Sequence, residues 1–77
     1  MNKARRKRIE KIAQELEDLR SDLELVTEEE QEAYDNMPES FQMSERGEHA
    51  ESVIENLELI MESMQEALDG LYSYEDE

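Results

Sequence analysis

Apolar residues recur at alternating steps of three and four along two long stretches of the chain, with polar residues between them. Such a repeat of 3.5 residues is typical of the seam between helices in a coiled coil. The pattern predicts an all-α chain with helices over residues 3–36 and 45–72, joined by a connection over residues 37–44. The seam residues are Ile9, Ile12, Leu16, Leu19, Leu23, Val26, Ala33 and Met37 in the first helix and Ala50, Val53, Leu57, Ile60, Met64, Ala67, Leu71 and Tyr74 in the second.

The two apolar series fit a chain that folds back on itself. In an antiparallel arrangement, each seam residue meets one of the other helix at a constant register, so that Leu23 faces Ile60. The midpoint of this pair and of the others falls between Phe41 and Gln42, close to the only proline of the chain, Pro38. The sequence therefore predicts an antiparallel two-helix coiled-coil hairpin, with the 77 residues forming a single domain.

Local signals in the connection agree with this placement. Pro38 disfavours helical backbone at the residue before it, so the first helix should end at Asn36 or Met37. The second helix should begin either with Pro38 in its first turn or at Ser44, whose hydroxyl can cap the amides that follow. Gly47 weakens that first turn by about 1 kcal/mol relative to alanine, which predicts a ragged start.

Further positions define the remaining details of the hairpin. We expect Phe41 to be buried at the closed end, with an exposed anchor for a partner as the alternative. Thr27 and Glu30 match a capping box, which allows a kink there, but one unbroken helix is the preferred reading. Gly70 could cap the second helix, leaving residues 73–77 as a frayed acidic tail.

The second helix carries another apolar row, beside its seam. Ile54, Met61 and Leu68 stand seven residues apart, and an isolated hairpin would leave them in water. Two hairpins that pack these rows together would form a dimeric four-helix bundle. We therefore expect a homodimer with Ile54, Met61, Leu68 and Tyr34 at its interface, and a docking groove for a host protein is the alternative use of the row.

Two sets of surface residues are candidates for contact with a partner. Leu25 and Leu59 occupy equivalent positions on the facing helices, at one level on the other flank of the hairpin. Carboxylates also repeat every seven residues along the second helix, about 10.5 Å apart. This acidic ridge is either a solvated helix face or an imitation of a nucleic-acid backbone. It consists of Glu48, Glu55, Glu62 and Asp69.

Charge is distributed very unevenly along the chain. Residues 1–20 hold seven Lys or Arg against four acids, a net charge of +3, whereas residues 21–77 hold one Arg against nineteen acids, a net charge of −18. The basic cluster could follow the phosphates of a nucleic acid. In the hairpin it would also lie level with the acidic tail, so charge complementation is the competing interpretation. The cluster comprises Arg5, Arg6, Lys7 and Arg8.

No residues of the chain form a recognisable catalytic or cofactor site. There is no cysteine and only one histidine, His49, and Arg46 stands where a Glu-x-x-His metal motif needs an acid. Glu30, which interrupts the first seam, is better explained as a register device or a local loosening of the seam. Glycine-rich phosphate loops and nucleophile–base pairs are absent from the sequence. We expect neither an enzyme nor a metal or cofactor, and no apolar run is long enough to predict a membrane span.

The stretch "EAYDNMPESFQMSERGEHAESVIENLELI", residues 32–60, resembles a recurrent type of small acidic protein found in phages and prophages. In that type, an acidic helix, a "DN-x-PES-x-Q-x-SERGE" connection and a second amphipathic helix follow one another. The resemblance covers the connection and much of the second helix. It implies an accessory protein of a mobile element, in the cytoplasm of an infected or lysogenic bacterial host, of a class that often binds host factors.

Together these features predict a non-enzymatic, strongly acidic interaction protein. It would bind a host or phage protein, with inhibition of nucleic-acid-processing or defence machinery as one outcome. The first alternative is a nucleic-acid-binding accessory protein that uses the basic cluster. The second is a structural or assembly protein built from coiled coils.

Overall fold

The computed structural model of the chain describes residues 1–76, with side chains through residue 74. It consists of the long helix α1 (Lys3–Asp35), the short helix α2 (Glu39–Gln42), the long helix α3 (Glu45–Tyr72) and the 3₁₀ helix η1 (Ser73–Asp76). Residues 1–76 contain no strand. The predicted all-helical class with two long helices is therefore confirmed.

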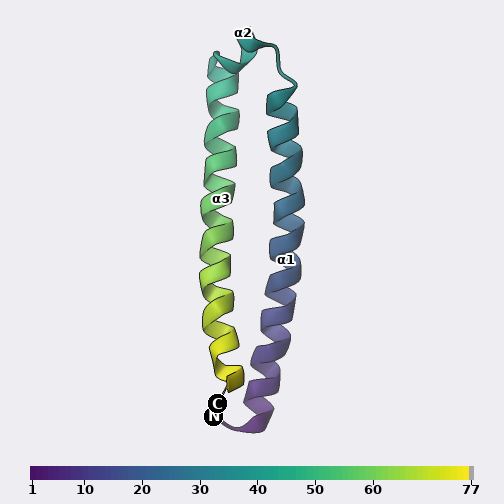
Figure 1. The fold of residues 1–77 in the computed structure, drawn as a ribbon, viewed down its shortest axis with the longest axis vertical. Helices are drawn as coiled ribbons and strands as arrows, with labels where there is room; N and C mark the ends of the chain where they lie inside the picture. Colours follow the sequence, from purple (N-terminus) through teal and green to yellow (C-terminus); the bar gives the residue numbers. More distant parts are fainter. Residues whose placement is uncertain (77) are drawn as a thin grey trace.

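The two long helices lie side by side and run in opposite directions (Figure 1). We refer to α1 and α3 together as the helix pair. The molecule is elongated, with extents of 58 × 15 × 14 Å. The N-terminus and the end of α3 lie at one end of the helix pair, and α2 closes the other end (Figure 1).

Helix α1 runs without interruption over 33 residues. At its start, the Asn2 side chain accepts a hydrogen bond from the Arg5 amide at 2.8 Å, which satisfies one of the free N–H groups of the first turn. Thr27 is buried, and its hydroxyl donates to the Leu23 carbonyl at 2.8 Å. This threonine therefore bonds back into its own helix rather than starting a new one.

The turn between the long helices is built around α2. The Gln42 side chain donates to the Tyr34 carbonyl at 2.9 Å, which ties α2 to the last turn of α1. Gly47 is buried against the same residue: a Cβ atom at Gly47 would lie 2.1 Å from the Gln42 carbonyl oxygen. The glycine is thus a packing requirement rather than the weak point expected at the start of α3.

The Phe41 ring is 51% exposed, so the expectation that it fills the closed end is wrong. Its neighbour Gln42 makes the side-chain hydrogen bond to α1 instead. Ser44 occupies the position before α3, but its hydroxyl donates to the Phe41 carbonyl and makes no capping bond to α3.

At the other end, α3 continues through Gly70 to Tyr72. Neither glycine has a positive φ, so the expected glycine cap at Gly70 is wrong. The 3₁₀ helix η1 follows directly, where the sequence suggested a frayed tail.

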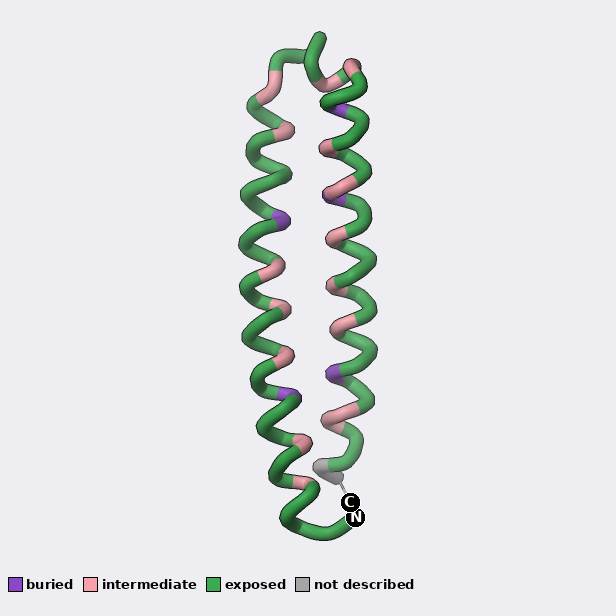
Figure 2. Tube along the Cα trace, turned by 180° about the vertical axis from the view of Figure 1, so that it is seen from behind, coloured by how far each residue is buried: buried purple, intermediate pink, exposed green. Residues whose placement is uncertain are grey.

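The core lies on the facing sides of α1 and α3 (Figure 2). Among the described residues, the most buried apolar side chains are Ala13, Ile54 and Leu68, which are 0%, 5% and 2% exposed. The Arg20 Nε donates to the Met61 carbonyl at 3.4 Å, which fixes the level of the two helices. Steps of seven residues in opposite directions from this contact bring Ala13 opposite Leu68, and Thr27 opposite Ile54.

One of the two predicted seam rows of each helix stays half-buried, with Leu16 and Leu23 in α1 and Leu57 and Met64 in α3, but the other row is replaced. The seam was expected to hold Ile12, Leu19, Val26 and Ile60, but these side chains are 53%, 59%, 47% and 41% exposed. The row one residue later in each helix takes their place, so the buried face of each helix is turned by about half of one 100° step. The small side chains of Ala13 and Thr27 leave room for the large Ile54 and Leu68, and this alternation of large and small residues packs two helices densely.

Candidate interaction surface

The predicted dimer row lies inside the helix pair. Ile54 and Leu68 are buried by α1, and Met61 is half-buried beside Arg20. The expectation that the hairpin leaves this row in water is therefore wrong. The physical reason is that α3 has three adjacent apolar rows, and α1 can cover only two of them. The row of Ile54 and Leu68, which lies opposite Ala13 and Thr27, is one of the two covered rows.

Tyr34, the fourth predicted interface residue, is half-buried, and its hydroxyl donates to Glu51 Oε1 at 2.8 Å. This hydrogen bond to the Glu51 carboxylate raises the pKa of Tyr34 above its ordinary value, and desolvation and the negative charges of Glu51 and Asp35 add to the effect. Tyr34 thus joins α1 to α3 near the closed end of the pair.

We expect the Tyr34 contact to weaken at alkaline pH. Because its folded pKa is raised, the stability it contributes is complete below the ordinary tyrosine pKa and is lost as pH rises through the folded value. Absorbance titration of tyrosinate should therefore show a late component that decreases in Tyr34→Phe. Glu51→Gln should move that component to lower pH, and an unchanged titration in Glu51→Gln would contradict this account.

The row left exposed by the helix pair forms an apolar surface along one flank. We call it the apolar flank, and its members share equivalent helical positions on α1 and α3. In an antiparallel pair, equivalent positions of the two helices face the same side, so the row is continuous across both. The apolar flank consists of Ile12, Leu19 and Val26 of α1 and Ile60 and Ala67 of α3.

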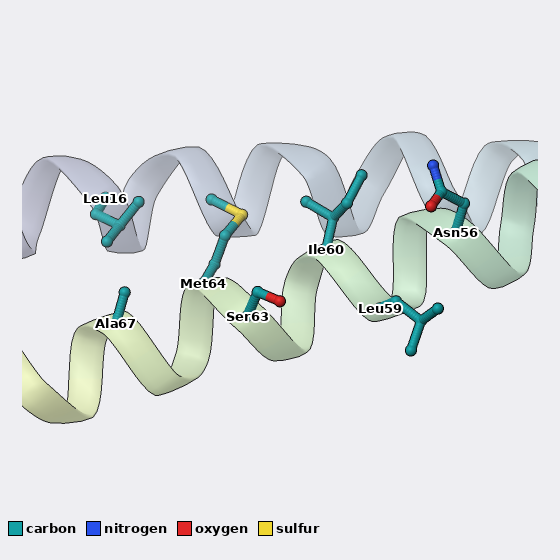
Figure 3. A pocket seen from close by; sticks show the side chains of 7 residues that line it. All are labelled: Leu16, Asn56, Leu59, Ile60, Ser63, Met64 and Ala67. Carbon is teal, nitrogen blue, oxygen red and sulfur yellow. The ribbon is translucent and has the colours of Figure 1, made fainter.

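An open groove of about 470 Å³ adjoins the α3 part of the apolar flank, at Ile60 and Ala67. Figure 3 shows Ile60 and Met64 pointing from α3 toward α1, beside Leu16, whereas Leu59 points away from α1. The remaining lining is small and uncharged. The full lining is Leu16, Asn56, Leu59, Ile60, Ser63, Met64 and Ala67.

The predicted contact pair is exposed at both positions. Leu25 is 59% and Leu59 is 61% exposed. Leu59 lines the groove, whereas Leu25 is absent from its lining. Leu25 lies two residues beyond the half-buried Leu23, which places it on the face of α1 away from α3. The structure therefore does not bring the two leucines into one groove.

The four residues of the acidic ridge, Glu48, Glu55, Glu62 and Asp69, are all exposed. Gln65 Nε2 donates to Asp69 Oδ1 at 2.9 Å. In α3, the ridge residues follow the apolar-flank row by two residues, as Glu62 follows Ile60 and Asp69 follows Ala67. At 100° per residue, this separation is about 200° around the helix. The acidic ridge and the apolar flank therefore lie on opposite sides of α3.

The basic cluster occupies the first turns of α1. Arg5, Lys7 and Arg8 are exposed, and Arg6 Nη2 donates to the Met1 carbonyl at 2.9 Å. Arg5 and Arg8 line a second open groove, together with Met1, Ile9 and Ile12, so the basic cluster adjoins one end of the apolar flank. Its expected partners, the side chains of Glu75–Glu77, lie outside the described residues.

Within the described part of the chain, no three side chains of the metal-binding types are grouped around a common point. His49 is exposed on α3. No described helix is long and apolar enough to cross a membrane. What the arrangement offers chemically is therefore two contrasting helix faces, one apolar and one acidic.

Sequence reasoning missed the apolar flank as a free surface, although one signal marked it. On the surface of α3, the row beside Ile60 and Ala67 consists of Asn56, Ser63 and Gly70. This edge of the helix therefore carries no acid, although the chain is strongly acidic. Comparison of the chain with family models, with curated proteins and with solved structures gives no match in any of the three.

Proposed function

We propose that the chain is a non-enzymatic protein-interaction module: an antiparallel coiled-coil hairpin that pairs into a four-helix bundle and binds another protein through its acidic ridge. The observation that carries this proposal is the position of the apolar flank, a row of half-exposed Ile, Leu and Val side chains along a highly charged molecule. Contiguous exposed apolar surface of this kind marks an interaction site.

The size of the apolar flank favours association. Burying a large aliphatic side chain contributes about 1.5–3 kcal/mol, so covering the exposed half of four such residues on each of two copies gives about 6–12 kcal/mol. The loss of translational and rotational freedom costs about 4–15 kcal/mol. The two ranges overlap, so burial of the apolar flank contributes a free energy of the size that a dimer needs. The four residues are Ile12, Leu19, Val26 and Ile60.

The acidic ridge suggests the chemistry of the further partner. Its carboxylates repeat about every 10.5 Å, close to three phosphate steps of about 3.4 Å along one nucleic-acid strand. A protein with a basic groove, such as a nucleic-acid-processing or defence enzyme of a bacterial host, offers complementary charge. The resemblance to phage accessory proteins favours the same class of partner.

The proposal is tested by retention of host proteins on the immobilised native chain and on two immobilised variants. Each variant has four acids neutralised, so the two variants have the same net charge. One neutralises the acidic ridge, with Glu48→Gln, Glu55→Gln, Glu62→Gln and Asp69→Asn. The control neutralises four exposed acids of α1, with Glu10→Gln, Glu15→Gln, Asp18→Asn and Glu24→Gln. A host protein that binds the native chain and the control, but not the ridge variant, should do the same when both components are pure.

Equal retention by both variants would overturn the assignment of the acidic ridge. Retention of nucleic acid alone would overturn the protein-binding function, and would favour the basic cluster as the working surface. Loss of that retention in a variant with Arg5, Lys7 and Arg8 neutralised would establish this second outcome.

A further inference from the structure

We infer that the apolar flank is covered by a second copy of this chain, laid antiparallel, so that the basic start of each α1 lies on the acidic end of the other α1. This inference rests on the self-association proposed above. It specifies which surface the two copies share and how they are oriented. The shared surface is the apolar flank and not the row expected from the sequence.

The composition of α3 supports contact between two copies of this helix. Between Val53 and Gly70, the two helical rows of α3 on this flank carry no charged residue, although the chain holds 23 acids. The charged residue of these rows, Arg46, lies one heptad before Val53 and is a cation. Several of the side chains are small, which lets two helix backbones approach closely. A second copy would therefore cover α3 without burying a carboxylate, which is costly. The rows are Val53, Ile60 and Ala67, and Asn56, Ser63 and Gly70.

The dimensions of the flank also suit a dimer. One side of the helix pair measures 58 × 15 Å between Cα extremes. Stable interfaces bury about 800 Å² on each partner. A second copy reaches this area only if the two rods overlap along nearly their whole length. Full overlap leaves two symmetric arrangements, parallel and antiparallel.

Charge decides between these two arrangements. Residues 3–11 hold six Lys or Arg and one acid, whereas residues 27–35 hold five acids and no cation. Leu19 lies midway between the two segments, and it is also the centre of the α1 part of the apolar flank. An antiparallel copy centred on Leu19 therefore brings a segment of net charge +5 onto one of −5 at both ends of the dimer.

The parallel arrangement instead gathers the basic segments of both copies at one end of the dimer and the acidic segments of both at the other end. Opposed segments on neighbouring helices lie within about 10 Å, comparable to the screening length of about 8 Å at physiological salt, so the difference is only partly screened. Arg8 and Glu29 share one edge of α1 by their heptad spacing, and Glu30 adjoins Glu29. In the antiparallel dimer, Arg8 of one copy therefore lies beside Glu29 and Glu30 of the other.

Disulfide mapping tests the arrangement directly, because the native chain has no cysteine. Leu19→Cys should cross-link to itself on mild oxidation. Ile12→Cys and Val26→Cys should each fail alone, because each would lie about 21 Å from its own copy, but a mixture of the two should cross-link. Leu25→Cys, exposed on the face of α1 away from α3, is the matched control and should not cross-link.

A charge exchange provides a second test that does not depend on packing at the cysteine. Arg5→Glu with Arg8→Glu should weaken self-association about tenfold or more in sedimentation equilibrium at low salt. Adding Glu29→Arg and Glu30→Arg to the same chain should restore it. Without that restoration, the opposed segments are not in contact.

The outcomes separate the two levels of the proposal. Self-linking of Ile12→Cys, with no mixed product, would overturn the antiparallel arrangement and leave the dimer intact. A monomeric mass for the native chain, with no cross-linked product in any variant, would overturn the self-association in the proposed function as well.

Discussion

Leu68→Ala should lower the free energy of unfolding by about 2–5 kcal/mol, the range for truncation of a buried leucine. Leu68 is 2% exposed and lies opposite Ala13, a residue too small to fill the space that the lost atoms leave. A chain of this length has a total stability of about 4–12 kcal/mol, so the substitution removes a large part of it. Urea denaturation followed by circular dichroism measures the loss.

Leu25→Ala is the matched control, since Leu25 is 59% exposed on the outer face of α1. It should change the free energy of unfolding by less than about 0.5 kcal/mol. Both variants and the native chain are compared at one protein concentration, because the proposed association with a second copy would make the apparent stability depend on concentration. If the two variants lose equal stability, Leu68 is not a core residue of the helix pair.

Gly47→Ala should also destabilise the chain, although alanine is the better helix former. The added methyl group would lie 2.1 Å from the Gln42 carbonyl oxygen, a backbone atom that cannot move without opening the turn at α2. Overpacking of this kind costs about 1–3 kcal/mol. For a chain of this size, each kcal/mol lowers the melting temperature by about 4–8 °C.

Gly70→Ala separates this steric effect from helix propensity. A Cβ at Gly70 would meet no atom within 4 Å, and the residue lies inside α3. The substitution should therefore stabilise the chain by up to about 1 kcal/mol. Opposite signs for the two substitutions are the expected result. A gain in stability for both would show that α2 does not pack against Gly47 in solution.

The two long helices could be predicted from the sequence because their signals are local. The 3.5-residue repeat identifies each helix without reference to the other, and Pro38 prevents α1 from continuing. The bounds of α3, Glu45–Tyr72, coincide with the expected range of 45–72. Helical periodicity and chain breakers act within a few residues, so one sequence is enough to find them.

The choice of packed row could not be predicted in the same way. Periodicity ranks the rows of each helix by apolar content, which favoured the row of Leu19 and Ile60. The structure instead selects a row by the fit between both helices, where Ala13 and Thr27 accept Leu68 and Ile54. A small rotation of each helix exchanges one row of the seam for the neighbouring row, so Ile54 and Leu68, expected at an interface, became core residues.

The turn was unpredictable for a related reason. The roles of Phe41 and Gly47 depend on contacts across α2, between backbone atoms that lie close together only after the chain has reversed direction. Composition suggested a buried aromatic ring and a weak glycine. The structure has an exposed ring and a glycine that no other residue can replace without movement of the backbone.

The opposite placement of the acidic ridge and the apolar flank on α3 has a consequence for valency. If the flank is covered by a second copy, the ridges of the two chains point outward on opposite sides of the assembly. One dimer could then hold two partner molecules at once, or two sites of one larger partner, and the second contact would benefit from a raised effective concentration. A chain of 77 residues would thereby act as a bivalent clamp.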